Sequence, residues 1–432
     1  MKSNAIFWFR RDLRLYDNHG LFKILKNYKN VLPIFIFDSE ILDKLPKDDA
    51  RVNFIHNQLK SLNDSLEKNQ KINTYYGRPV QIFKKLISDF PIEFVYTNHD
   101  YEPYAIARDE AVKSLLNEKS IGFKSFKDQV IFERNEVTKD DGMPYKVYTP
   151  YSKKWLGAFT EKCIEAYPSE DLLKHLSKMN LNQWVTLDAM GFTTSKLKIA
   201  PFKMDKQLIN LYEERRNIPS VAGTSRLGPH LRFGTISIRS VVKKALKSSN
   251  ITFLKELIWR EFFMQILWHF PYTVTKSFKP QYEAIQWRNN KEEFEKWCQG
   301  ETGYPLVDAG MRELNQTGFM HNRVRMLVGS FLCKHLLIDW RWGEAYFAQK
   351  LHDFELSSNI SNWQWVAGCG VDAAPYFRIF NPTTQIAKFD KDHLYIKKWV
   401  PEYQEFNYVK PIVDHKFARE RCLETYKLAL NR

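Results

Sequence analysis

The sequence predicts an α/β amino-terminal domain with a parallel, doubly wound sheet, followed by an all-α carboxyl-terminal domain. Three observations predict this. Short apolar runs at 5–9, 31–37 and 93–96 indicate buried strands. The stretches 51–66 and 105–116 carry apolar residues at helical spacing, and strands that alternate with helices are typical of a parallel sheet covered on both faces. After Met204 the strand signals fade and helical periodicity takes over.

The length of 432 residues exceeds what one core usually supports, so more than one domain is expected. We expect an α/β domain over 1–131, a linker over 132–204 and a helical domain over 205–432. No GxGxxG follows the first strand, where the run from Arg10 to Arg14 stands instead. The Rossmann-like sheet therefore need not bind a dinucleotide in the Rossmann manner.

The composition favours a nucleic-acid partner. Lys and Arg exceed Asp and Glu by 65 to 50, a net charge of +15, which favours a polyanion over a membrane surface. Charge alone does not distinguish a nucleic-acid-binding protein from a merely soluble basic protein. The five cysteines form no CxxC pair, which argues against a disulfide framework or a zinc site. No signal peptide or transmembrane run is found, so we expect a cytoplasmic monomer without a bound metal.

Three motifs carry possible chemistry, and each also has an ordinary structural interpretation. The segment 223–230 is a turn that should open a helix and could cradle phosphate, although taken alone a plain N-cap is the favoured interpretation. Glu256, Trp259 and Arg260 could contact a stacked base, or the two charged residues could simply pair at i,i+4. One helical turn brings Asn322, Arg325 and Met326 to one side.

These motifs together resemble the photolyase/cryptochrome family, closest to its class I cyclobutane pyrimidine dimer photolyases. The resemblance is carried, in chain order, by WFRRDLRLYDN, ARDEAV, TSRLG, ELIWREF, TGYPLVDAGMREL, GFMHNRVRM, DWRWG, NWQW and DAAPYFRIFNP, and it covers nearly the whole chain. It implies an α/β antenna domain, a long linker and a helical domain that holds a folded FAD. The implied activity is that of a carbon–carbon lyase: light-dependent repair of cyclobutane pyrimidine dimers by an electron from excited, reduced, anionic FAD.

The resemblance implies a set of flavin-binding residues. Arg325 and Asp353 match the ion pair beside the isoalloxazine, and Asn359 matches the residue that faces flavin N5. Gly228 stands where many members have Ser, so one phosphate contact is missing. The full implied set is Tyr212, Thr224, Ser225, Arg226, Leu227, Gly228, Trp259, Arg260, Asn322, Arg325, Asp353, Glu355 and Asn359.

The resemblance also implies an electron-transfer chain and a lesion pocket. The chain is Trp363 nearest the flavin, then Trp340, then Trp287 at the surface; taken singly, each could be an ordinary core aromatic. The dimer would be flipped out of ultraviolet-damaged DNA, with Glu256 bound to the base edges and active in catalysis. The implied DNA contacts are Arg216, Glu256, Trp259, Asn322, Arg323, Met326 and Trp365.

An antenna chromophore, methenyltetrahydrofolate or a deazaflavin, is a possible second cofactor of the α/β domain. Glu102 could contact a folate there, although an ordinary solvated acid at a strand end is the favoured interpretation. Neither the identity nor the presence of the antenna follows from the sequence.

Three rival activities stay open at this point. A cryptochrome photoreceptor would carry Asp rather than Asn359, and the (6-4) enzymes would carry a His where Asn322 and Met326 stand. A DASH-type photolyase of single-stranded DNA often has Tyr in place of Trp365. The resemblance therefore favours repair of the cyclobutane dimer by a bacterial, cytoplasmic protein that associates with the nucleoid when bound to DNA.

Overall fold

The computed structural model describes residues 4–179, 181 and 183–430. Within these residues the contacts define two compact units. The α/β unit comprises residues 1–136, 156–200 and 227–247, and the helical unit comprises 137–155, 201–226 and 248–432. The chain thus returns to the α/β unit twice after its sheet is complete, whereas the sequence predicts one continuous linker over 132–204.

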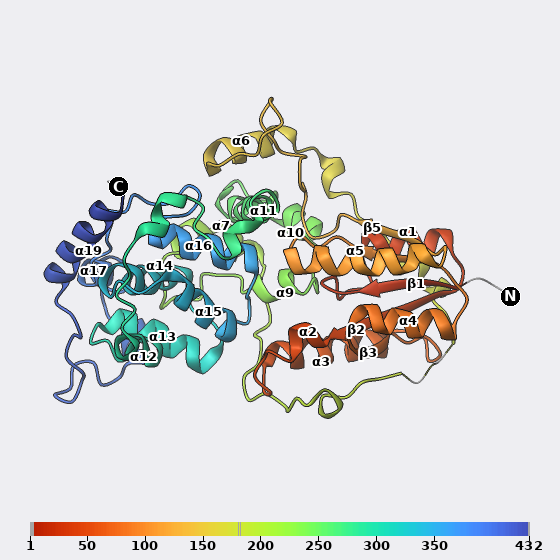
Figure 1. Ribbon diagram of the computed structural model, residues 1–432, viewed down its shortest axis with the longest axis horizontal. Helices are drawn as coiled ribbons and strands as arrows, with labels where there is room; N and C mark the ends of the chain where they lie inside the picture. Colours follow the sequence, from red (N-terminus) through yellow and green to blue (C-terminus); the bar gives the residue numbers. More distant parts are fainter. Residues whose placement is uncertain (1–3, 180, 182, 431–432) are drawn as a thin grey trace. The chain divides into compact units, whose positions relative to one another are not determined.

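A five-stranded parallel sheet forms the centre of the α/β unit, in the order β3-β2-β1-β4-β5 (Figure 1). The three predicted strands are confirmed as β1 (Asn4–Phe9), β2 (Val31–Asp38) and β4 (Ile92–Asn98). The two edge strands, β3 (Asn73–Gly77) and β5 (Gly122–Phe126), were not predicted. Their sequences NTYYG and GFKSF mix polar and aromatic residues, because an edge strand does not need the continuous apolar run of a central one.

Helices cover both faces of this sheet. Phe7 of β1 packs in one buried cluster with residues of α1 (His19–Asn27) and α3 (Ala50–Ser65). Its neighbour Trp8 packs in a second cluster with residues of α4 (Pro79–Asp89) and α5 (Pro103–Glu118). Successive strand residues point to opposite faces, so the two clusters are the two sides of one sheet. The predicted helices 51–66 and 105–116 are confirmed as α3 and α5; α2 (Ser39–Leu42), α9 (Gly228–Arg232) and α10 (Ile238–Ala245) complete this unit.

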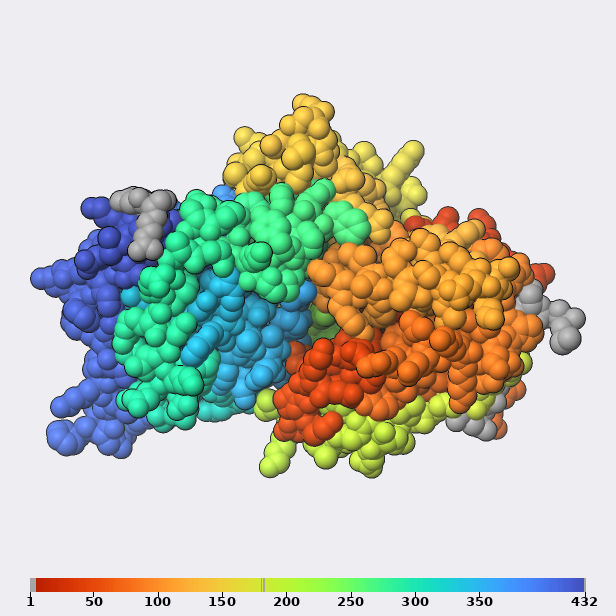
Figure 2. All heavy atoms as spheres, in the orientation of Figure 1, coloured from red at the N-terminus to blue at the C-terminus, as the bar shows by residue number. Residues whose placement is uncertain are grey.

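The helical unit contains no strand among its described residues. Figure 2 shows the side chains that fill the spaces between the ribbons of Figure 1. Within this unit, α13 has Pro305 in its first turn, and its C-cap is Gly318, whose φ of 66° favours glycine. The helices are α7 (Lys206–Asn210), α8 (Tyr212–Arg215), α11 (Thr252–His269), α12 (Lys291–Gln299), α13 (Pro305–Thr317), α14 (Asn322–Ser330), α15 (Trp340–Lys350), α16 (Leu356–Ala367), α17 (Pro382–Phe389), α18 (Leu394–Trp399) and α19 (His415–Leu430), while α6 (Tyr148–Ala158) begins here and ends in the α/β unit.

A buried ionic cluster fastens the late segment 227–247 to the rest of the α/β unit. Asp128 accepts hydrogen bonds from Arg14 at 2.5 Å and from Arg239 at 2.8 Å. Arg239 also donates to Asp17 at 2.8 Å. Burial opposes ionisation of Asp128, but the two guanidinium groups outweigh it and hold the pKa of this carboxyl below its usual range. The four charges therefore form one unit that depends on every member.

His321 caps the amino-terminus of α14. Its Nδ1 accepts a hydrogen bond from the backbone N–H of Arg323 at 3.2 Å, so this nitrogen carries no proton. Burial, together with Arg325, Arg226 and Arg323, lowers the pKa of His321 from 6.5 to about 4. The cap is therefore neutral at physiological pH, and it loses its acceptor when acid protonates the ring.

Asp128→Asn should lower the free energy of unfolding by about 3–5 kcal/mol, because it leaves two guanidinium groups buried beside a neutral amide. Since the pKa of Asp128 is depressed, the contribution of the carboxylate is complete above its unfolded pKa and declines as pH falls through its folded pKa. Urea denaturation at pH 7 measures the loss. The control is Glu110→Gln at an exposed position of α5, where the carboxylate lies 3.4 Å from Lys113, and it should cost less than about 1 kcal/mol. Equal losses in the two variants would contradict the central role of the cluster.

His321→Asn should make the protein less sensitive to acid, because Asn caps a helix without titrating. The folded protein resists protonation of His321 down to pH about 4, whereas the unfolded chain takes up the proton near 6.5. Stability from this group is therefore lost as pH falls from 6.5 towards 4, by up to about 1.4 kcal/mol per pH unit. Unfolding free energies at pH 7 and pH 5 check this: relative to the variant, the natural protein should lose about 1.5 kcal/mol. Equal losses of unfolding free energy in the natural protein and the variant, between pH 7 and pH 5, would show that folding does not lower the pKa of His321.

Candidate active site

The helical unit encloses a cavity of about 360 Å³, within the size range of cofactor and ligand pockets. Five elements supply its wall: α11, α14, α15, α16 and the α15–α16 connection, with Arg216 directly after α8. The cavity brings together twelve of the residues that the sequence predicts, which are Arg216, Glu256, Trp259, Arg260, Asn322, Arg325, Met326, Asp353, Glu355, Asn359, Trp363 and Trp365.

Arginine–carboxylate pairs line one part of this cavity. Arg325 donates to Asp353 across 2.9 Å and to the Met320 carbonyl at 2.7 Å, so its guanidinium is fixed. Arg260 lies 3.5 Å from Glu355, and both side chains are largely buried. Glu256 pairs with Arg216 rather than with Arg260, so the predicted alternative of an i,i+4 pair is not what forms. Charge pairs thus link α11 and α14 to other segments. Arg260 of α11 and Arg325 of α14 pair with residues of the α15–α16 connection, and Glu256 of α11 pairs with Arg216.

Trp259 is held flat by an aromatic partner. Its ring stacks on Tyr148 with centroids 3.6 Å apart and an interplanar angle of 6°. The Tyr148 hydroxyl donates to the Lys255 carbonyl at 2.8 Å, which anchors the phenol to α11. One face of Trp259 is therefore occupied, and the ring is pre-oriented at the cavity wall.

Asn359 is oriented by a carboxyl group. Its Nδ2 donates to Glu344 Oε1 at 2.8 Å and to the Glu344 carbonyl at 3.1 Å. Burial raises the pKa of Glu344, while the hydrogen bond from Asn359 lowers it. Because Nδ2 is engaged with Glu344, the amide orientation of Asn359 is fixed where it lines the cavity.

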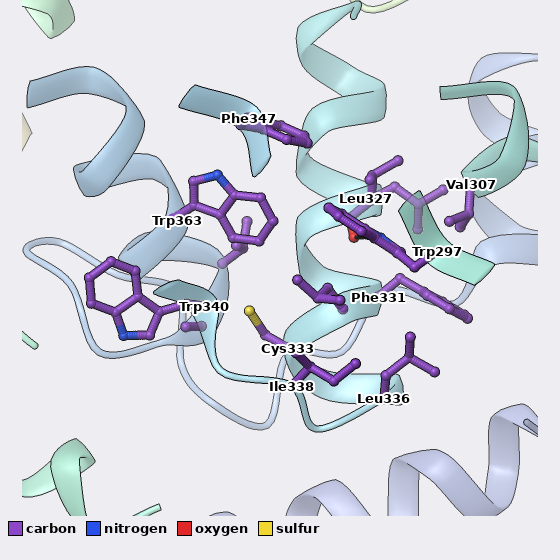
Figure 3. Close-up of a cluster of buried hydrophobic side chains, with 14 of the residues drawn as sticks. Trp297, Val307, Leu327, Phe331, Cys333, Leu336, Ile338, Trp340, Phe347 and Trp363 are labelled. Carbon is purple, nitrogen blue, oxygen red and sulfur yellow. Dashed lines mark hydrogen bonds between the residues drawn. The ribbon is translucent and has the colours of Figure 1, made fainter. Parts of the chain in front are cut away.

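The tryptophans of the predicted relay lie in the principal buried cluster of the helical unit. Trp363 and Trp340 are 3% and 1% exposed and belong to this cluster (Figure 3). Gly343 allows α15 to approach α16, since a Cβ there would lie 2.1 Å from the Trp363 ring. Trp287 is partly buried and packs against the cluster, with its ring 6.1 Å from Tyr426.

The remaining predicted residues do not line the cavity. Arg226 has φ 58° and lies over the Phe319 ring at 3.2 Å, and Tyr212 packs against Phe253. Arg323 donates to Asn217 at 2.6 Å. Neither Thr224 nor Ser225 caps α9, because Leu227 is its N-cap, and Leu227 and Gly228 belong to the α/β unit. The phosphate roles of Thr224, Ser225, Arg226, Leu227 and Gly228 stay predictions.

Several functional-site residues escaped the sequence analysis. Tyr148 lies in the predicted linker and Glu344 directly follows the DWRWG motif, and only the tertiary contacts bring them to Trp259 and Asn359. The other missed residues that line the cavity are Phe263, Gly329, Phe347, Leu351, Phe354, Ser358, Asn362 and Val366. Helical spacing from Trp259 and Asn359 could have found Phe263 and Asn362.

In the α/β unit, Glu102 is an ion-paired residue rather than a solvated acid. Its carboxylate accepts hydrogen bonds from Arg11 at 3.2 Å and from Arg232 at 2.7 Å. Nearby, the pKa of Asp100 is well below its usual range, because Arg11 and other arginines outweigh the effect of burial. The folate contact predicted for Glu102 would therefore compete with two guanidinium groups.

The described chain has neither a membrane-spanning helix nor a cluster of metal-binding side chains. Within residues 4–179, 181 and 183–430, none of the helices combines the length and the apolar character that a membrane span requires. The same residues contain no group of three or more His, Cys, Asp and Glu side chains placed to hold a metal ion.

The cavity fits the flavin that the resemblance implies. Asp353 Oδ1 is buried and accepts no hydrogen bond from the described residues, so it can receive an N–H donor of a ligand. Arg325 places a fixed positive charge next to it, and Phe263, Phe347 and Phe354 provide apolar wall. A polar heterocycle with one anionic edge suits this combination.

Comparison with known proteins agrees with this geometry. Residues 253–407 match the family profile described as the FAD binding domain of DNA photolyase, and residues 5–170 match the DNA photolyase profile. A deoxyribodipyrimidine photo-lyase of Agrobacterium fabrum is 37% identical, over 98% of this chain and 97% of the relative.

Two solved structures extend the likeness to the fold. A class III photolyase from Agrobacterium tumefaciens has a TM-score of 0.89 at 34% identity, over 100% of this chain and 98% of that one. An archaeal photolyase from Sulfolobus tokodaii, whose structure holds two FAD molecules, has a TM-score of 0.81 at 32% identity, over 99% and 100% of the chains. The chain described here belongs to the DNA photolyase family.

Proposed function

We propose that this protein repairs cyclobutane pyrimidine dimers in ultraviolet-damaged DNA in a light-dependent reaction. The observation that carries the proposal is the cavity itself, where Trp259, Trp365 and Met326 lie with Glu256 and Asn322 beside the Arg325–Asp353 pair. FAD in this cavity would supply the electron for ring opening and take it back afterwards. The residues of the chain would hold the dimer, orient it and exclude water.

The lesion would enter the cavity after flipping out of the duplex, which costs least for a damaged pair. Trp259 and Trp365 offer aromatic faces for the two bases, and Tyr148 keeps the first of these rings in place. Glu256 and Asn322 offer polar groups to the base edges. Arg216 and Arg323, on a chain of net charge +15, would bind the flanking phosphates.

Flavin contacts are proposed for the polar wall. Arg325, Asp353 and Asn359 would bind the isoalloxazine, with Glu344 as the positioning residue of Asn359. Arg260 and Glu355 support this wall, and Thr224, Ser225 and Arg226 would bind the phosphates. Trp363, Trp340 and Trp287 would relay electrons inward when an oxidised flavin is reduced by light.

Two observations favour this proposal over two of its three rivals, and the comparison of single- and double-stranded substrates tests the third, a DASH-type photolyase. Asn359 lies in the cavity wall with its amide fixed by Glu344, where a plant-type photoreceptor would carry an acid. Asn322 and Met326 line the cavity, in the segment where the (6-4) enzymes would carry a His. Antenna binding, nucleoid association and the monomeric state are expected but rest on the sequence alone.

The direct experiment measures repair of a thymine-dimer oligonucleotide by the FAD-loaded, dithionite-reduced protein. We expect loss of the dimer under blue light and none in the dark, with single- and double-stranded substrates compared. Bound, photoreducible flavin without repair in either substrate would favour a photoreceptor or a (6-4) enzyme, and the (6-4) lesion would be assayed next.

Trp363→Phe should slow photoreduction of oxidised flavin while leaving repair by pre-reduced enzyme nearly intact. Phenylalanine keeps most of the packing against Phe347, whose ring centroid lies 4.9 Å away, but it is much harder to oxidise than indole. The two rates are measured on the same preparation, with flavin content as the check on folding. An equal fall of both rates would show that the relay and the repair site are not separable.

A further inference from the structure

Lys334 is a buried lysine to which the proposed function gives no role. It lies on a π-helical turn, η6 (Phe331–His335), and is 1% exposed. Its ammonium donates to the Arg378 carbonyl at 2.9 Å, the one hydrogen bond that it makes in the described part of the chain. We propose that Lys334 is a positioning residue for DNA binding, which holds the loop 371–381 so that Arg378 can bind a DNA phosphate. This inference rests on the DNA repair of the proposed function.

A buried ammonium with one hydrogen bond is costly, because its other N–H groups lose water without gaining a partner. The groups that act most on the charge of Lys334 are Arg378 and three thiols: Cys333 of η6, Cys369 after α16, and Cys422 of α19. Burial raises the pKa of all three thiols, so they carry no compensating charge at physiological pH. Figure 3 shows Cys333 within the buried cluster. What the ammonium holds therefore explains its place better than stability does.

The loop 371–381 is tied at both ends to residues of the proposed DNA site. At its start, Asp372 accepts a hydrogen bond at 3.1 Å from the backbone N–H of Tyr148, whose ring supports the cavity wall. At its end the loop runs into α17, where the Phe389 ring lies 4.3 Å from the Arg323 guanidinium. The buried ammonium fixes the stretch between these two ends.

Arg378 belongs to a group of three arginines. Burial lowers the pKa of Arg323, and the positive charges of Arg216 and Arg378 lower it further. Arg378 is exposed; its guanidinium lies 5.8 Å from the Phe380 ring and has no carboxylate partner within the described residues. A phosphate relieves the repulsion between guanidinium groups and accepts hydrogen bonds from them. Arg378 thus adds a third phosphate donor to the two of the proposed function.

The titration of Lys334 distinguishes a positioning role from a merely structural one. Burial lowers the pKa of Lys334 from 10.5 to about 8, and the charge of Arg378 acts in the same direction. A charged ammonium donates a stronger hydrogen bond than a neutral amine, so the loop is held less firmly above pH 8. The unfolded chain keeps this proton up to about pH 10.5, so the contribution of Lys334 to folding stability rises as pH rises from 8. DNA affinity and folding stability therefore change in opposite directions.

The test measures binding of the FAD-loaded protein to a thymine-dimer oligonucleotide in the dark, by fluorescence anisotropy, between about 50 and 200 mM salt. Arg378→Gln should weaken binding about fivefold and reduce the salt slope by about 1, as the loss of one phosphate contact does. Lys334→Met should weaken binding about threefold or more and also reduce the slope, although its buried side chain cannot touch DNA. The double variant should bind no more weakly than Arg378→Gln. Lys296→Met, which removes one charge from an exposed position of α12, is the matched control and should change neither quantity.

The same assay at pH 7 and pH 9 tests the protonation of Lys334. The Kd of the natural protein should rise about threefold or more between these values, while its resistance to urea stays equal or increases. Lys334→Met should show no such rise in Kd. His335, the neighbour of Lys334 on η6, has a pKa of about 3 and does not change charge in this range.

The inference is overturned if Lys334→Met keeps the natural affinity and salt slope, if the losses of the two single variants add in the double variant, or if the natural affinity does not fall above pH 8. Should Lys334→Met fail to retain FAD, the pH dependence decides: the rise in Kd should occur in the natural protein and be absent from Arg378→Gln, and equal rises would overturn the inference. A natural protein that does not bind the oligonucleotide at all would contradict the proposed function, and the inference with it.

Discussion

Both units of this protein depend on guanidinium groups that are held away from water by paired carboxylates. In the α/β unit Arg14 and Arg239 share Asp128, and in the helical unit Arg325 is held by Asp353. A buried charge without its partner costs several kcal/mol, so each pair forces the segments that carry it into one arrangement. Charge pairing of this kind does not maximise stability, but it fixes which helix meets which.

The helical unit uses this constraint to combine a polar wall and an apolar wall in one cavity. The pairs Arg325–Asp353 and Arg216–Glu256 leave charged groups at defined positions, while Trp259 and Trp365 supply flat apolar surface. A flavin and a flipped base both have a polar edge and an aromatic face. The same cavity can therefore hold both types of ring.

The aromatic core of this unit has a second consequence. Tryptophan is large and fills space well, but a cluster that contains Trp297, Trp340 and Trp363 also offers several easily oxidised groups at ring contact. The same side chains therefore fill the core and are chemically oxidisable.

The sequence by itself determined the α/β character of the first unit, its three central strands, and the identity of twelve of the twenty residues that line the cavity. These were accessible because apolar periodicity is local and because the motifs retain their order along the chain. The edge strands β3 and β5 were not accessible, since their mixture of polar and aromatic residues carries a weak pattern.

Only the tertiary structure decided which residues pair. It joined Glu256 to Arg216 instead of Arg260, placed Tyr148 on Trp259, and set Glu344 behind Asn359. It also returned residues 227–247 to the α/β unit. The physical reason is that such contacts join segments far apart in the chain, and their energy depends on burial and on competing partners, neither of which a local pattern contains.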